Sequence, residues 1–340
     1  MTDSPLDDLD NPRPPPWMRA PWERFWRARQ AGRLPHALLL AGAAGIGKGL
    51  FAEALAAALL CPRVTSAGLA CGHCEDCQLL RAGNHPDRAL LGPDPDAKTQ
   101  EIRVDAIREL IQGEALSAHR GRYKIILIDP AHQLNRAAAN SLLKTLEEPS
   151  AQTVMILVSA EPNRLPATIR SRCQCLTMPL PTESMALAWL SERAGDADPR
   201  QLLRLAPGAP VRALAYRDSD LVARREERFA GFQGVVRGAC DPIAEAGAWN
   251  TLDSRLSCQW LSSWVSDLLR LAADRDCVHL TNPDKRADLF RLVERLDAAQ
   301  LHVVLQRIFY ARAVVDTTIN KQLLLESILI DLAQLSPETG

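Results

Sequence analysis

The sequence predicts an α/β fold in the first half of the chain, where a parallel sheet is covered by helices on both faces, and helices alone in the second half. Three short apolar runs, at residues 37–41, 125–128 and 154–158, have the length of buried strands. Helical patterns separate these runs, and such alternation is typical of a parallel sheet with helices on both faces. Beyond about residue 179 strand-like runs disappear, so the remainder is expected to be helical.

A glycine-rich loop joins the first predicted strand to an alanine-rich helical pattern at residues 50–60. The order strand, glycine loop, helix is that of a phosphate-binding loop, in which backbone amides surround the phosphates and a lysine contacts them. The matching residues are Gly42, Gly45, Gly47 and Lys48. We therefore expect a site that resembles a nucleotide-binding site at the end of this strand.

Two groups that a working ATPase needs are missing from this site. Position 49, where a serine or threonine hydroxyl would bind magnesium, is Gly49. Asp129 ends the strand at 125–128, but Pro130 follows it and offers no carboxylate to orient an attacking water. The site is therefore predicted to be degenerate and inactive, with ATP or ADP binding doubtful. Weak nucleotide binding stays open, because anion binding at a helix N-terminus requires only backbone amides.

The other elements follow from periodicity and from proline. A strand is predicted at residues 88–91, and helices at 104–116 and 136–148, the last ended by Pro149. Prolines at 179, 181, 207 and 210 mark a small helical domain up to about residue 216. Apolar residues then recur at every fourth position over 252–268, on one face of a helix at 301–309, and broadly over 321–332. Such stripes indicate core packing, although a subunit interface is the alternative for the last helix.

Four cysteines lie close together behind the glycine loop, with the spacing C-x9-C-x2-C-x2-C: Cys61, Cys71, Cys74 and Cys77. Four thiolates suit tetrahedral zinc in a closed, structural site. An iron–sulfur cluster fits less well, because the usual further cysteine followed by proline is missing. Ordinary reduced cysteines are the remaining alternative. His73 and His85 are expected to be exposed loop residues rather than ligands.

Composition narrows the class of protein. The net charge of −1 gives no sign of nucleic-acid binding by the chain as a whole. The first sixteen or so residues, acidic and then proline-rich, are expected to form a loose arm. They carry neither a basic start nor an apolar run, and no segment has membrane-spanning length, so a cytoplasmic protein is expected.

Several segments occur in an order that resembles the clamp-loader ATPases of bacterial DNA polymerase III, a branch of the AAA+ family. They are the strand with its glycine loop, the cysteine group, NHPD (84–87), SLLKTLEEP (141–149) and ATIRSRC (167–173). The resemblance is dense over residues 34–175 and looser towards the C-terminus. It implies an AAA+ domain at 1–178 with a zinc-binding insertion at about 61–77, a helical lid at 179–216 and an all-α collar for oligomerisation at 217–340.

The resemblance also implies a function. Members of this family form a heteropentamer that opens a ring-shaped sliding clamp and closes it around primed DNA. Gly49 and Pro130 group this chain with the members that do not hydrolyse ATP. Its expected partners are the ATPase motor subunits, the clamp-opening subunit, the sliding clamp and primer–template DNA.

Individual residues acquire expected roles by the same resemblance. Arg172 is expected to act in trans as an arginine finger on nucleotide held by a neighbouring subunit, because a planar guanidinium suits the transferring phosphoryl group. Arg170 ranks second. Arg212 resembles a lid arginine that senses the γ-phosphate and Ser159 a sensor hydroxyl, while a plain structural role is as consistent for each. Two basic residues are candidates for contact with duplex DNA inside the ring: Arg136 and Lys144.

Two other functions stay open at this point. One is a catalytically active clamp-loader-type ATPase that tolerates Gly49, which hydrolysis by the isolated chain would support. The other is a zinc-stabilised nucleic-acid-binding protein, which salt-sensitive retention of duplex DNA would support.

Overall fold

The computed structural model consists of two compact units, Met1–Arg217 and Asp218–Gly340. It describes residues 12–94, 101–112, 118–120, 123–149, 152–294, 296–315, 317 and 319–335. The predicted lid, residues 179–216, belongs to the first unit. None of the helices described is both long and apolar enough to cross a membrane.

The first unit is built on a five-stranded sheet of order β2-β3-β4-β1-β5, whose neighbouring strands all run parallel. The strands are β1 (Ala37–Ala41), β2 (Arg88–Leu91), β3 (Lys124–Ile128), β4 (Thr153–Ser159) and β5 (Gln174–Thr177). The predicted parallel sheet is thus confirmed. Strand β5 was not predicted, because it is short and only Leu176 among its residues is buried. Its position beside β1 at the sheet edge explains this lack of an apolar run.

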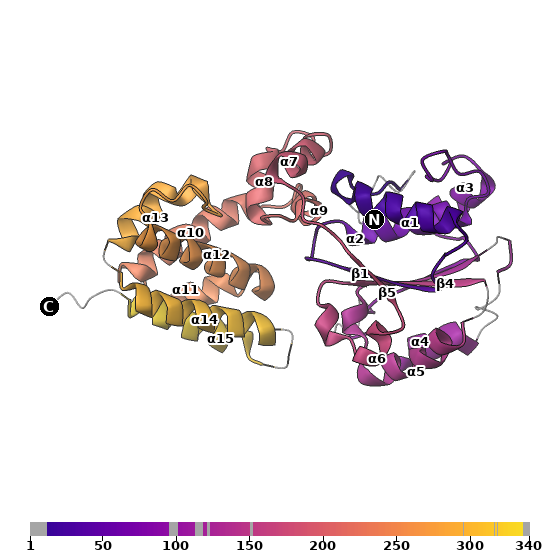
Figure 1. Ribbon diagram of the computed structural model, residues 1–340. Helices are drawn as coiled ribbons and strands as arrows, with labels where there is room; N and C mark the ends of the chain where they lie inside the picture. Colours follow the sequence, from indigo (N-terminus) through magenta and orange to yellow (C-terminus); the bar gives the residue numbers. More distant parts are fainter. Residues whose placement is uncertain are drawn as a thin grey trace. The chain divides into compact units, whose positions relative to one another are not determined.

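Helices cover both faces of the sheet (Figure 1). On one face lie α1 (Arg19–Gln30) and α2 (Lys48–Leu60), and on the other α4 (Val104–Gln112), α5 (Arg136–Glu147) and α6 (Ala167–Arg170). Alternate strand residues such as Leu39 and Leu157 pack against α5 in one buried cluster. Asn135 caps α5 by accepting a hydrogen bond from the Ala138 amide, at 2.8 Å. The predicted helix at 104–116 begins as expected, and its last four residues lie outside the described part.

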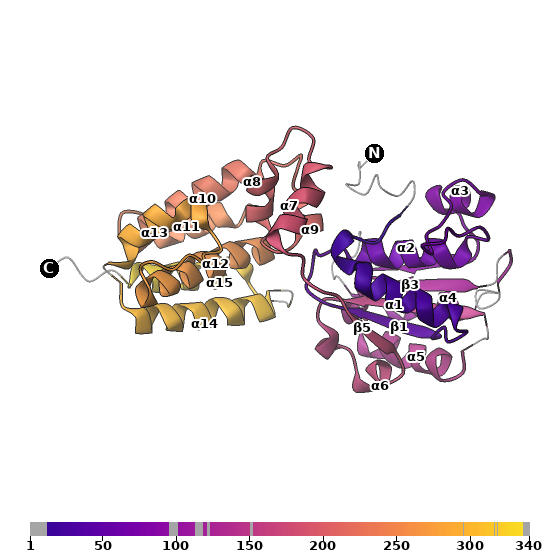
Figure 2. The ribbon, with the colours of Figure 1, turned by 45° about the horizontal axis from the view of Figure 1, so that its top comes forward.

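Shorter elements complete this unit. The 3-10 helix η2 (Pro16–Met18) precedes α1, and α3 (Glu75–Arg81) lies in the cysteine-containing insertion. The 3-10 helices η4 (Ala131–Gln133) and η5 (Pro162–Arg164) follow β3 and β4. The lid segment consists of α7 (Glu183–Ser191), α8 (Pro199–Leu205) and α9 (Pro210–Ala215). Figure 2 shows α7, α8 and α9 grouped together at one end of the unit.

Among its described residues the second unit is helical, as predicted. Its elements are α10 (Leu221–Val236), α11 (Pro242–Trp249), α12 (Ser254–Ala273), η6 (Pro283–Lys285), α13 (Arg286–Val293), α14 (Ala298–Val314) and α15 (Lys321–Ala333). The predicted stripe at 252–268 is buried, with Trp260 and Trp264 almost inaccessible. Two residues assigned to apolar stripes are instead exposed: Phe309 on α14 is 49% exposed and Leu323 on α15 is 60% exposed. Both side chains project from the exposed side of their helices.

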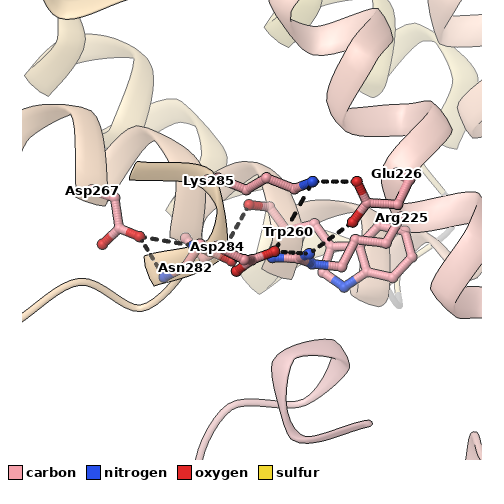
Figure 3. A network of polar contacts seen from close by, with 8 residues as sticks. Arg225, Glu226, Trp260, Asp267, Asn282, Asp284 and Lys285 are labelled. Atoms are coloured by element: carbon pink, nitrogen blue, oxygen red, sulfur yellow. Dashed lines mark hydrogen bonds and ion pairs between the residues drawn. The ribbon is translucent and has the colours of Figure 1, made fainter. Parts of the chain in front are cut away.

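A buried polar network links α10, α12 and the segment before α13 (Figure 3). Arg225 on α10 donates to Asn282 Oδ1 at 2.7 Å and to Asp284 Oδ2 at 2.9 Å. Asp267 on α12, which is completely buried, accepts from the Asn282 amide at 2.7 Å. Because a buried charge requires a charged or hydrogen-bonding partner, these contacts hold the three segments in one arrangement.

Candidate functional site

The glycine loop lies between β1 and α2, as predicted, and its glycines are required by its backbone. Gly45 and Gly47 have φ angles of 76° and 95°, which side-chain-bearing residues rarely adopt. Space is also lacking: a Cβ at Gly45 would lie 2.7 Å from Arg212 Cβ, and one at Gly47 would lie 2.8 Å from Pro15 Cγ. The loop is therefore in close contact with other parts of its own chain.

Lys48 opens α2 and is buried, with 5% of the residue exposed. Its Nζ donates to the loop carbonyls of Gly42, at 2.9 Å, and Ala43, at 2.6 Å. Burial lowers the pKa of Lys48 to about 8. The negative charge of Asp129 opposes this decrease, and the positive charge of Arg212 adds to it. Burial likewise raises the pKa of Asp129 to about 6, against the attraction of Lys48. The structure thus brings together the predicted residues Lys48, Asp129 and Arg212 around the loop.

The position of the missing magnesium ligand is sterically restricted. A Cβ at Gly49 would lie 2.9 Å from Asp129 Oδ2, so the carboxylate occupies space that a serine or threonine side chain would enter. Ser159 at the end of β4 is completely buried. Its Oγ lies 3.3 Å from His132 Nδ1 and accepts from the Glu161 amide at 3.1 Å. Ser159 is thus bonded to protein groups at the end of its strand.

The lid and the N-terminal segment both attach to the glycine loop. Gly45 O accepts hydrogen bonds from the amides of Val211, at 3.1 Å, and Arg212, at 3.3 Å, in lid helix α9. The neighbouring Ile46 O accepts from Trp17 Nε1 at 2.9 Å. Trp17 also packs edge-to-face against Trp189 of lid helix α7, with ring centroids 5.7 Å apart. No local sequence pattern indicates these contacts, because they join segments about 30 to 170 residues apart.

The four predicted cysteines form one cluster, in which the Sγ atoms all lie within 4.8 Å of one another. Cys61 follows the end of α2, and Cys74 caps α3 by accepting from the Cys77 amide at 3.4 Å. The pairs Cys61–Cys74 and Cys71–Cys77 each have an Sγ–Sγ distance of 3.9 Å. Tetrahedral zinc with Zn–S bonds of about 2.3 Å would place sulfurs about 3.8 Å apart. The donor set therefore fits a structural zinc ion.

The two nearby histidines lie outside this cluster. His73 is exposed, as expected, and its Nδ1 lies 2.8 Å from Cys71 O. His85 was expected to be exposed, and that prediction is wrong, because only 4% of the residue is accessible. Its Nδ1 accepts from the Asp87 amide at 3.0 Å, and its Nε2 lies 3.4 Å from Asp76 Oδ1 on α3. His85 thus links the insertion to the start of β2.

Helix α1 holds the other side of the insertion. Trp22 Nε1 donates to Ala67 O at 3.1 Å. Gly68 rests on the ring of Trp26, since a Cβ there would lie 2.3 Å from Trp26 Cδ2. Helix α1 therefore contacts the insertion at residues 67–68, while the cysteine cluster itself packs against Ala57 of α2 and Leu80 of α3.

Arg172 does not join the glycine-loop residues but lies beyond α6, with 35% of its side chain exposed. Its Nη2 donates to Glu147 Oε1 at 2.6 Å and its Nη1 to Thr168 O at 3.0 Å. Arg170 contacts a different group, Asn163 Oδ1, at 3.2 Å. The candidate DNA-contacting residues on α5, Arg136 and Lys144, are both exposed.

Comparisons with known proteins agree over nearly the whole chain. A family model described as DNA polymerase III, delta subunit, matches residues 18–182, and one described as DNA polymerase III, delta subunit, C terminal, matches residues 219–334. The chain is 37% identical to DNA polymerase III subunit delta' of Pseudomonas aeruginosa, over 94% of this chain and 97% of the relative. The chain is 34% identical to DNA polymerase III subunit delta' of Escherichia coli, over 93% of this chain and 94% of that relative.

A third relative matches only part of the chain. DNA polymerase III subunit tau of Salmonella typhimurium is 39% identical over 142 residues, which are 42% of this chain and 21% of that protein. The delta' relatives, by contrast, cover both units. The chain therefore belongs to the delta' family of DNA polymerase III clamp-loader subunits.

Proposed function

We propose that this chain is a non-hydrolysing subunit, or stator, of the clamp loader, and that it helps to place the sliding clamp on primed DNA. The observation that carries this proposal is the double loss at its own nucleotide-like site. Gly49 supplies no magnesium ligand, and Pro130 supplies no carboxylate for the attacking water. Because phosphoryl transfer depends on both groups, the site is unsuited to hydrolysis.

The geometry around Gly49 also leaves little room for a magnesium-binding side chain. Asp129 Oδ2 lies where a side chain at position 49 would begin. Lys48 donates to the carbonyls of Gly42 and Ala43, so its ammonium has partners within the loop itself. Restoring a hydroxyl at position 49 would thus also require Asp129 to move.

The contacts of the lid support a rigid role. Lid helix α9 donates two amide hydrogen bonds to Gly45 O, and Trp17 fills the space between the loop and α7. These contacts join protein groups directly, and none of them needs a phosphate as a partner. A subunit whose lid is held in this way offers a fixed surface against which ATPase subunits can move.

The catalytic contribution that we assign to this chain is Arg172, acting on nucleotide bound by an adjoining motor subunit. The residue is partly exposed and permanently charged, as a residue that reaches into a neighbour's site must be. Arginine fingers in general raise phosphoryl-transfer rates by about 10³ to 10⁵. The other proposed partners are the clamp-opening subunit, the sliding clamp and primer–template DNA.

We assign the four-cysteine cluster to structural zinc. The residues that would hold the ion are Cys61, Cys71, Cys74 and Cys77, three of which are buried. Zinc in such a shell supplies folding energy and no reactive position. Because α3 lies within the insertion and α1 contacts it, a bound ion would stabilise this side of the first unit.

The test is to substitute Arg172→Ala in the assembled loader, with Arg170→Ala as the matched control. The isolated chain should hydrolyse no ATP above background with magnesium and DNA. Arg172→Ala should leave assembly intact and lower DNA-stimulated ATP turnover in part, because other sites keep their own fingers, with a larger loss of clamp loading. Arg170→Ala, at the second-ranked arginine, should stay close to wild type, and a loss confined to this variant would assign the finger to Arg170 instead. Unchanged ATP turnover and clamp loading for Arg172→Ala would reject the finger, and turnover by the isolated chain that Lys48→Ala abolishes would reject the stator.

A further inference from the structure

Arg172 is held by a residue from a different helix. Glu147, the last residue of α5, accepts from Arg172 Nη2 at 2.6 Å, and Thr168 O accepts from Nη1 at 3.0 Å. The guanidinium therefore contacts one acceptor from the SLLKTLEEP segment and one from its own turn. An arginine has five N–H donors, so donors remain for a further ligand.

The pairing follows from core packing rather than from chance contact at the surface. Leu146, which precedes Glu147, is 2% exposed. Ile169, three residues before Arg172, and Cys173, directly after it, are 0% and 9% exposed. All three belong to the same buried cluster. Since their backbones are fixed by this cluster, Glu147 and Arg172 are brought to one place whenever the unit is folded.

Glu147 is also poorly placed for any role in its own helix. It is the final residue of α5, where the helix dipole presents its negative end and disfavours a carboxylate. The opposite charge of Arg172 compensates this carboxylate. Glu148 next to it is exposed too, but no contact of its side chain with Arg172 is seen among the described residues.

We propose that Glu147 is a positioning residue for the arginine finger. Its carboxylate restricts the rotamers of a long side chain and, together with Thr168 O, holds the guanidinium at the α5–α6 surface. The remaining N–H donors would meet a phosphate of the neighbouring subunit. The pair is half exposed, with side-chain exposures of 35% for Arg172 and 50% for Glu147. Exposed ion pairs are weak, so this contact favours one orientation of the Arg172 guanidinium but still allows it to leave Glu147 for another ligand.

This inference rests on the proposed finger role, and the test separates the two. Loader complexes carrying Glu147→Ala, Glu147→Gln, Arg172→Ala and the double substitution are compared with a matched control, Glu148→Ala. The component of ATP turnover that depends on Arg172 is the difference between wild type and Arg172→Ala. Glu147→Ala should lower the kcat of that component by about two- to five-fold, the range expected of an exposed pair, with KM for ATP unchanged.

Three further outcomes define the role. Glu147→Gln keeps an acceptor oxygen at the same place, so it should retain most of the activity, and Glu148→Ala should equal wild type. In the Arg172→Ala background, Glu147→Ala should cause no additional loss. Because removal of a carboxylate from a helix C-terminus does not destabilise the helix, thermal unfolding should be unchanged or slightly improved.

The results that would overturn the inference are specific. If Arg172→Ala lowers turnover but Glu147→Ala does not, Glu147 has no positioning role and the finger stands. If Glu147→Ala lowers turnover equally with and without Arg172, it acts through another route. If Arg172→Ala itself has no effect, the finger role fails first and the positioning role fails with it.

Discussion

Trp17 is expected to hold the lid to the glycine loop, and its substitution tests the rigid arrangement directly. Trp17 is 6% exposed, donates to Ile46 O at 2.9 Å and packs against Trp189. Trp17→Ala removes a buried ring and a hydrogen bond, and such substitutions cost about 3–5 kcal/mol. Trp17→Phe keeps a ring but leaves Ile46 O unpaired, at a cost of about 1–3 kcal/mol.

Native-state hydrogen exchange measures this effect locally, which matters because the chain has two units that need not unfold together. The informative amides are those of Val211 and Arg212, which bond to Gly45 O. Trp17→Ala should reduce their protection by about 100-fold or more, since each 1.36 kcal/mol is a factor of ten. Trp17→Phe should reduce it by about ten-fold.

The amide of Leu268 in α12 of the second unit serves as the internal control, because Trp17 belongs to the first unit. Its protection should not change in either variant. If Trp17→Ala increases exchange around Ile46 but leaves the amides of Val211 and Arg212 protected, Trp17 does not secure the lid. The attachment would then depend on the backbone hydrogen bonds of α9 alone.

Two other predictions concern the metal and the buried charges. Native protein should contain one zinc per chain, and Cys74→Ser should lower its zinc affinity. Chelation of the zinc should first raise hydrogen exchange in residues 61–81. Native protein without zinc, or a Cys74→Ser variant that binds zinc as tightly as wild type, would contradict this prediction. Burial raises the pKa of Asp129 from 3.8 to about 6. The protonated carboxyl therefore adds about 3 kcal/mol to the free energy of unfolding below pH 4, and this contribution is lost as the pH rises through 6. Urea titrations of Asp129→Asn between pH 4 and 6.5 should lack this decline, and a profile parallel to wild type would refute the assignment.

Local sequence patterns were sufficient for four of the five strands and for the two motifs. Strands β1, β3 and β4 are fully buried, and therefore read as continuous apolar runs. The glycine loop and the cysteine group are also local motifs, since each spans no more than 17 consecutive residues. Such features depend on neighbours in the chain, which the sequence displays directly.

What the sequence did not show depends on contacts between distant segments. His85 looks like a loop histidine, yet it is buried because α3 and the start of β2 close around it. Trp17 follows a run of prolines and gives no sign of its contact with Ile46. Glu147 reads as an exposed charge near a helix end, and only the packing of α5 and α6 against one cluster brings it to Arg172.

The presence of Lys48 beside Gly49 and Asp129 has a structural explanation. Its ammonium lies among the carbonyls of Gly42 and Ala43 and offsets the charge of Asp129, which is itself buried. Removal of one partner from a buried charge pair leaves the other uncompensated, which is more costly than keeping both. Lys48 therefore stabilises the fold of the loop on which Trp17 and α9 rest, and its presence in the motif is not by itself a sign of hydrolysis.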